Sequence, residues 1–155
     1  MPNKKEVSKI SETRVSEIKR VFSLLKHPVE FKPRDAMQIM IGSAILAVPV
    51  GFTEETWKLG ETLPTLNVFV LLVTSLLFIS LFVYHNYYKG NFAEHWDEFV
   101  KRVLGTYVVS AVVVGLLLTI IHRAPWSADL LLAVKRVIIV AFPASMSAAV
   151  ADMIK

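Results

Sequence analysis

Hydrophobic and polar residues follow one another along this chain in long blocks rather than in short periods. Four apolar blocks each approach or exceed the roughly 20 residues that an α-helix needs to cross ~30 Å of hydrocarbon. They run from about Asp35 to Glu54, from Pro64 to about Tyr87, from about Val103 to Ile121 and from about Ala128 to Met153. The pattern predicts an all-α integral membrane bundle with four transmembrane helices.

A different periodicity precedes the first block. Apolar residues between positions 6 and 26 fall within one broad arc at 100° per residue, which is typical of an amphipathic helix. We expect residues 1–32 to form this basic cytoplasmic helix with a short linker, and residues 33–155 to form the transmembrane domain. The helix either grips anionic lipid through its cations or packs on a bundle.

Composition and charge indicate how the chain is oriented in the membrane. The chain is 54% hydrophobic, above the roughly 45–50% of soluble domains. Thirteen Lys/Arg fall on the side of the termini and four on the other, so both termini are expected in the cytoplasm. The basic charge thus indicates membrane orientation, not nucleic-acid binding. Trp57 and Trp126 are expected to anchor the outer interface and Trp96 the inner one.

Small residues separate the spans into two kinds. The second span is bulky, which suits a helix facing lipid, whereas the other three carry stripes of small residues that allow backbones to approach closely. The stripes are Ser43, Ala47 and Gly51, then Ala111 and Gly115, then Ala141, Ser145, Ala148 and Asp152. These three spans should form the bundle interior or a contact within a homo-oligomer.

The first span carries the clearest candidate chemistry. Pro49 removes an amide donor and can kink the helix, and the span ends on Glu54 and Glu55. Either carboxylate could pair with Lys135 or Arg136, cations near the start of the fourth span. One alternative is a structural salt-bridge cluster at the outer end. The other is a mouth or gate that attracts cations.

Three further acids belong to the same analysis. Asp129 is a further intramembrane ion-pair candidate near the cations of the fourth span, and Asp152 is an ion-path candidate at its other end. Asp35 stands at the start of the first span, where capping explains an acid without any substrate. The chain shows no nucleophile set, phosphate loop or metal-ligand spacing. We therefore expect no enzyme activity, metal or cofactor.

The stretch from Gly42 through Pro49, Thr53, Glu55 and Trp57 to Gly60 resembles a family signature. It is similar to the first-helix pattern Pro…Thr-x-Glu-x-Trp-x-x-Gly of small prokaryotic integral membrane proteins of unknown function. The resemblance singles out Thr53, Glu55 and Trp57 and implies the plasma membrane of a prokaryote. It implies no activity.

These observations predict a small multi-pass membrane protein that works as an oligomeric ion channel or small-solute permease, with cations favoured. The path or gate candidates are Glu55, Glu54, Thr53, Pro49 and Asp152. The alternative is a non-transporting scaffold or accessory subunit whose intramembrane charges are structural pairs.

Overall fold

The chain divides into two units, Met1–Glu30 and Phe31–Lys155. The structure is a computed structural model, and it describes residues 14, 33–88 and 96–154. The amphipathic helix expected over positions 6–26 lies outside the described residues, Arg14 excepted. The second unit carries every feature discussed below.

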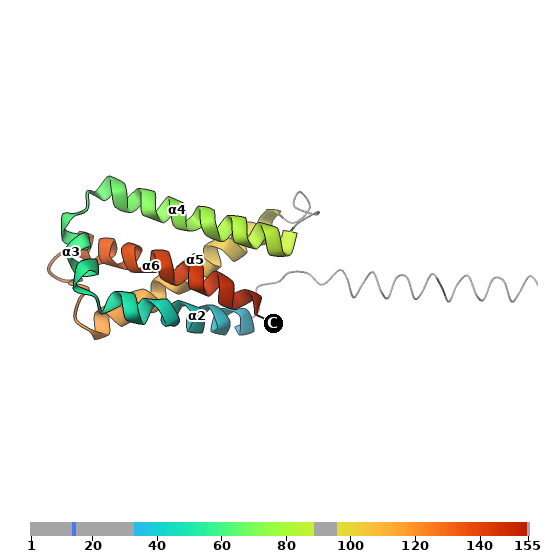
Figure 1. Ribbon diagram of the computed structural model, residues 1–155, viewed down its shortest axis with the longest axis horizontal. Helices are drawn as coiled ribbons and strands as arrows, with labels where there is room; N and C mark the ends of the chain where they lie inside the picture. The colour runs from blue at the N-terminus through green and yellow to red at the C-terminus, as the bar shows by residue number, and fades with distance from the viewer. Residues whose placement is uncertain (1–13, 15–32, 89–95, 155) are drawn as a thin grey trace, which may run out of the picture. The chain divides into compact units, whose positions relative to one another are not determined.

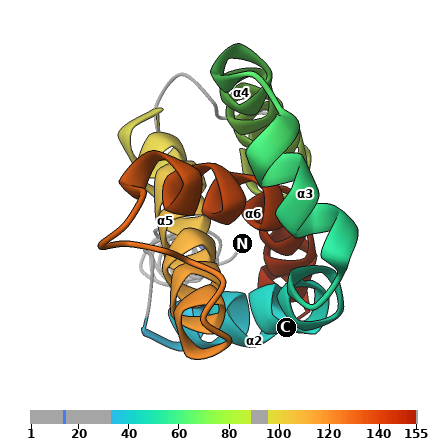
Figure 2. The ribbon, with the colours of Figure 1, turned by 90° about the vertical axis from the view of Figure 1, so that its left-hand side faces the viewer.

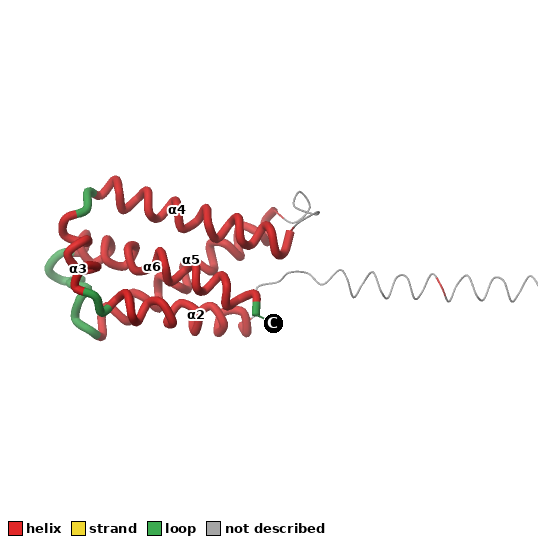
Figure 3. The backbone as a smooth tube through the Cα atoms, in the orientation of Figure 1, coloured by secondary structure: helices red, strands yellow, loops and turns green. Residues whose placement is uncertain are grey.

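Every regular element among the described residues of this unit is helical (Figure 3). The elements are α2 (Pro33–Gly51), α3 (Glu54–Thr62), α4 (Thr65–Val83), the π-helical turn η1 (Tyr84–Tyr88), α5 (Trp96–Ile120) and α6 (Leu130–Met153). Helices α2 and α5 run in one direction and α4 and α6 in the other (Figure 1). We call the end where α2 begins and α6 ends the terminal end, and the opposite one the α3 end.

Three of these helices are long and apolar enough to cross a membrane, namely Thr65–Asn86, Trp96–Ile120 and Leu130–Met153. A fourth span is formed if α2 and α3 count together, although the pair is bent by 84°. The predicted class, a helical membrane bundle, is confirmed.

The first span ends earlier than the sequence predicts. Helix α2 stops at Gly51, and α3 begins at Glu54 in a new direction, crossing the end of the bundle between α2 and α4 (Figure 2). Glu54 and Glu55 therefore open a second helix instead of closing the first. Pro49 lies within α2, two residues before its end, on the exposed side of the helix.

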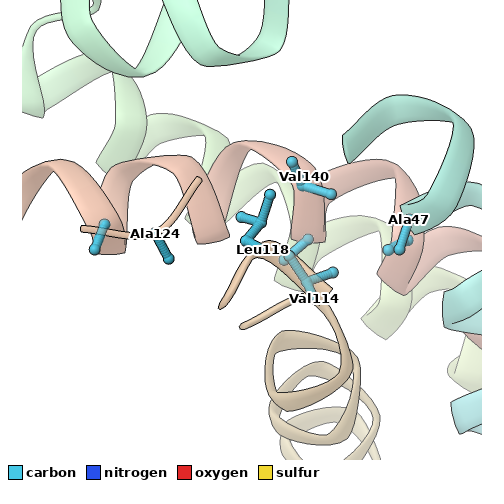
Figure 4. Packing of buried hydrophobic residues seen from close by; sticks show 8 residues of the cluster. Ala47, Val114, Leu118, Ala124 and Val140 are labelled. Atoms are coloured by element: carbon cyan, nitrogen blue, oxygen red, sulfur yellow. The ribbon is translucent and has the colours of Figure 1, made fainter. Parts of the chain in front are cut away.

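Helix α6 is the common partner of the other helices, since α2, α3, α4 and α5 all pack against it. An apolar cluster fills the middle of this packing, including Ala47, Val114, Leu118 and Val140 (Figure 4). The small stripe of α2 is buried. Helix α4 is the least enclosed, with 22% of its apolar window buried against 33% for α5 and 39% for α6.

Candidate functional site

Side chains next to the break between α2 and α3 form hydrogen bonds with backbone carbonyls at the end of α2. The Thr53 hydroxyl donates to the Val50 carbonyl at 2.8 Å and lies 2.6 Å from the Thr56 hydroxyl. Trp57 reaches back and donates from Nε1 to the Gly51 carbonyl at 2.8 Å. The break frees carbonyls that would be costly to leave bare in hydrocarbon. Thr53 and Trp57 therefore stabilise the bend.

Arg136 of α6 fixes α3 over the bundle. Its side chain is 7% exposed, with Nη2 2.6 Å from Glu61 Oε1 and Nη1 donating to the Arg123 carbonyl at 2.8 Å. A Cβ on Gly60 would lie 2.6 Å from Arg136 Cγ. Glycine is thus what allows α3 to lie directly on the arginine stem.

The turn after α5 places a second arginine at this end. His122 has φ 57°, a left-handed conformation that is uncommon outside glycine. The amides of Arg123 and Ala124 both donate to the Leu118 carbonyl, at 2.8 and 3.1 Å. The guanidinium of Arg123 then lies over the Trp57 ring, 3.7 Å from its centroid. This cation–π contact joins the α5–α6 turn to α3.

The other charges of the α3 end are less enclosed. Lys135 Nζ donates to the Leu63 carbonyl at 2.9 Å. Glu54 pairs with Lys58 at 3.0 Å, one helical turn along α3, with both side chains largely exposed. Glu55 is exposed and makes no hydrogen bond or ion pair with the described residues. Asp129 caps α6, because its Oδ1 accepts from the Leu132 amide at 2.9 Å.

The terminal end holds a more deeply buried charge cluster, formed by Asp35, Arg102 and Asp152. Arg102 is 1% exposed, Asp152 2% and Asp35 3%. Nε and Nη2 of Arg102 donate to Asp152 Oδ2 at 3.0 and 2.6 Å, and Nη2 lies 3.6 Å from Asp35 Oδ2. One guanidinium thus links α2, α5 and α6. We call these three residues the terminal charge cluster.

Buried hydroxyl groups continue from this cluster into the bundle. Thr106 and Ser110 follow Arg102 at four-residue intervals on α5, and the Ser43 hydroxyl of α2 donates to that of Ser110 at 2.9 Å. On the other face of the core, the hydroxyls of Ser75 and Ser145 lie 3.5 Å apart. The apolar cluster around Val114 and Leu118 follows (Figure 4). Polar groups thus extend part of the way through the bundle, and apolar side chains close the rest.

A family model described as "Putative integral membrane protein (DUF2391)" matches residues 4–154. The chain belongs to this family. A search of curated proteins and a search of solved structures each find no match for the chain. Membership makes it an integral membrane protein; the description names no activity. The match covers nearly the whole chain and does not single out the Thr53–Trp57 signature.

The structure changes several predicted partnerships. Arg136 pairs with Glu61, and neither Glu54 nor Glu55 is its partner, because the break at Gly51 turns α3 across the bundle and carries Glu61 over Arg136. Asp129 is a helix cap instead of an intramembrane ion-pair partner. Trp126 donates to the Thr119 hydroxyl at 2.7 Å at the α3 end, and Trp96 is exposed where α5 begins.

Two residues that matter were not singled out in the sequence. The apolar block begins at Val103, so the sequence places Arg102 in the preceding loop. In the structure α5 begins seven positions before Val103, and Arg102 lies within the helix. Its signal was the spacing Arg102, Thr106, Ser110, Val114, which places polar and apolar residues on one helical face. Glu61 had no such signal, since it lies 75 positions from its partner. Among the described residues, no three His, Asp or Glu side chains could hold a metal ion together.

Proposed function

We propose that this protein is a small-ion transport protein of the membrane, with small cations favoured, and that the described structure is its closed form. The observation that carries the proposal is the terminal charge cluster. Ionisable side chains enclosed among membrane helices are costly, and in membrane proteins they mark ion pathways and proton relays. Two carboxylates in this cluster favour a cation over an anion.

The path proposed for the ion runs along the interior of the bundle. It starts at the terminal charge cluster, follows the hydroxyls of Thr106, Ser110 and Ser43, and ends at the apolar cluster. Hydrophobic constrictions close ion paths by excluding water. In this proposal Val114 and Leu118 act as the gate, and both are fully buried.

The membrane setting of the proposal follows the charge distribution. With 13 Lys/Arg on the side of the termini against four on the other, the termini face the cytoplasm and the α3 end faces outward. The plasma membrane is the proposed location. A homo-oligomer is also proposed, in which each copy carries its own ion path through its bundle.

The experiment is ion flux through liposomes that contain the purified full chain. Val114→Thr keeps the volume of the side chain but adds a hydroxyl to the gate, and it should raise cation flux several-fold because water enters more readily. Val112→Thr is the matched control, since Val112 lies on the same helix and is 55% exposed toward lipid. Its flux should equal that of the natural protein.

Glu55→Gln tests the outer mouth in the same assay. If Glu55 attracts cations to the α3 end, removing its charge should lower flux at low ionic strength, and the loss should fade as salt screens the charge. No flux above that of empty vesicles, in any cation gradient and for both Val114→Thr and the natural protein, would overturn the transport proposal.

A second candidate is a non-transporting scaffold or accessory subunit. It is favoured by the close intrachain pairing of the two buried arginines, with Arg102–Asp152 and Arg136–Glu61 both at 2.6 Å. Such pairs serve a structural purpose in this reading, and no ion replaces either partner. A folded Val114→Thr variant that conducts no ions would support the scaffold.

A further inference from the structure

Arg123 is held rigidly at the surface of the α3 end. Its backbone is fixed by the left-handed turn at His122 and by the bond from Arg136 to its carbonyl. The Cζ atom of its guanidinium lies over the Trp57 ring, 3.7 Å from the centroid. A stacked guanidinium presents its N–H donors at the edge of the plane, where they can meet a planar or tetrahedral oxyanion bidentately.

The donors of this guanidinium are available to a ligand. The side chain of Arg123 is exposed, and its N–H groups have no hydrogen-bond or ion-pair acceptor among the described residues. The nearby carboxylate, Glu61, is already bound to Arg136. Arg136 also donates to the Arg123 carbonyl. Two arginines thus lie close together beside one engaged carboxylate, an arrangement that favours an added anionic group.

The depth of the site indicates which anionic group it meets. Trp57 and Trp126 both lie at this end, and tryptophan concentrates where hydrocarbon meets the headgroups. Helix α3 turns by 84° from α2, so α3 lies close to the plane of the interface if α2 crosses the membrane. The phosphates of the bilayer are at this level.

We infer that Arg123, placed over the Trp57 ring, forms a binding site for the phosphate group of an anionic phospholipid. The phosphate oxygens accept from the edge of the guanidinium while the acyl chains follow the exposed apolar side of α5, which includes Leu116 and Ile120. This site is separate from the lipid contact expected for the N-terminal segment, and it does not depend on ion transport.

Native mass spectrometry of the full chain, titrated in detergent with phosphatidylglycerol, tests this inference. The natural protein should retain one lipid tightly, and Arg123→Gln should weaken that binding about tenfold, as expected for a lost charge-assisted bidentate contact. The substitution leaves the backbone carbonyl in place, so the bond from Arg136 survives. Lys58→Gln is the matched control: it removes one cation from the exposed side of α3, and it should change affinity less than about threefold.

Two further arms decide the remaining questions. Arg123→Lys keeps the charge but loses the planar fork, and it should lose several-fold in affinity; unchanged binding would overturn the role of the stacked guanidinium. Equal losses for Arg123→Gln and Lys58→Gln would also overturn the inference, because the binding would then follow net charge alone. Inorganic phosphate is titrated in parallel. Phosphate binding as tight as that of the lipid would identify a soluble anion as the source of the phosphate group.

Discussion

Side chains of the signature have distinct tasks at the bend between α2 and α3. Thr53 and Trp57 occupy the carbonyls of Val50 and Gly51, and Gly60 makes room for Arg136. Glu55 has none of these tasks, although it stands in the middle of the pattern. The carboxylate of Glu55 is therefore not needed to form the bend. It stays a candidate for contact with ions.

Replacing Trp57 should destabilise the bend. Trp57→Phe keeps an aromatic ring beneath Arg123 but removes the donor to the buried Gly51 carbonyl. We expect the free energy of unfolding to fall by about 1–3 kcal/mol, the cost of leaving a buried acceptor unpaired. Chemical unfolding in mixed micelles measures it. Glu55→Gln is the control, and a loss of equal size there would show that α3 responds to any change.

Glycines set how closely the helices approach, and they make a test with an internal control. A Cβ on Gly42 would overlap Ala151 Cβ and lie 3.0 Å from the backbone of Ala148. Gly42→Ala should therefore force α2 away from α6 and cost about 1–3 kcal/mol. At Gly115 the nearest atom, of Trp126, is 4.0 Å away. Gly115→Ala should leave stability unchanged or raise it by about 0.5–1 kcal/mol.

Thermal unfolding of the three proteins in the same detergent distinguishes the two glycines. The expected order of stability puts the Gly115→Ala protein at or above the natural one and the Gly42→Ala protein well below it. If both substitutions lower the unfolding temperature equally, the close approach of α2 to α6 is not the reason that position 42 requires glycine.

The sequence predicts the helices whose position follows from the length of an apolar segment. The membrane helices follow from the hydrophobic blocks, because a helix satisfies all its backbone hydrogen bonds within one continuous apolar segment. The break was not predictable from Pro49 alone. It lies at Phe52 and Thr53. There the side chains of Thr53 and Trp57 donate hydrogen bonds to carbonyls at the end of α2, in place of the helical backbone bonds that are lost. Partners 50 or 75 positions apart, such as Arg102 with Asp152 and Arg136 with Glu61, depend on how the helices pack.

At the scale of the whole molecule, the terminal charge cluster connects three helices through Arg102. Asp152→Asn leaves the arginine enclosed with its closest acceptor neutralised. We expect a loss of about 3–5 kcal/mol of stability, the usual cost of breaking a buried ion pair from one side. Asp129→Asn, at the other end of α6, is the control, because asparagine caps a helix as well as aspartate does. Similar losses for both variants would contradict the buried pairing.

The central place of α6 also determines the order of events during biosynthesis. Helices α2 to α5 precede it in the chain, yet α2, α3 and α4 each pack on α6 more than on any other helix, and α5 packs on both α2 and α6. The ribosome therefore releases three spans into the membrane before their common partner exists. During that interval Arg102 can reach Asp35 but not Asp152. Insertion of the last helix brings Asp152 to Arg102 and completes the bundle in the same step, so a chain that stops before α6 lacks both.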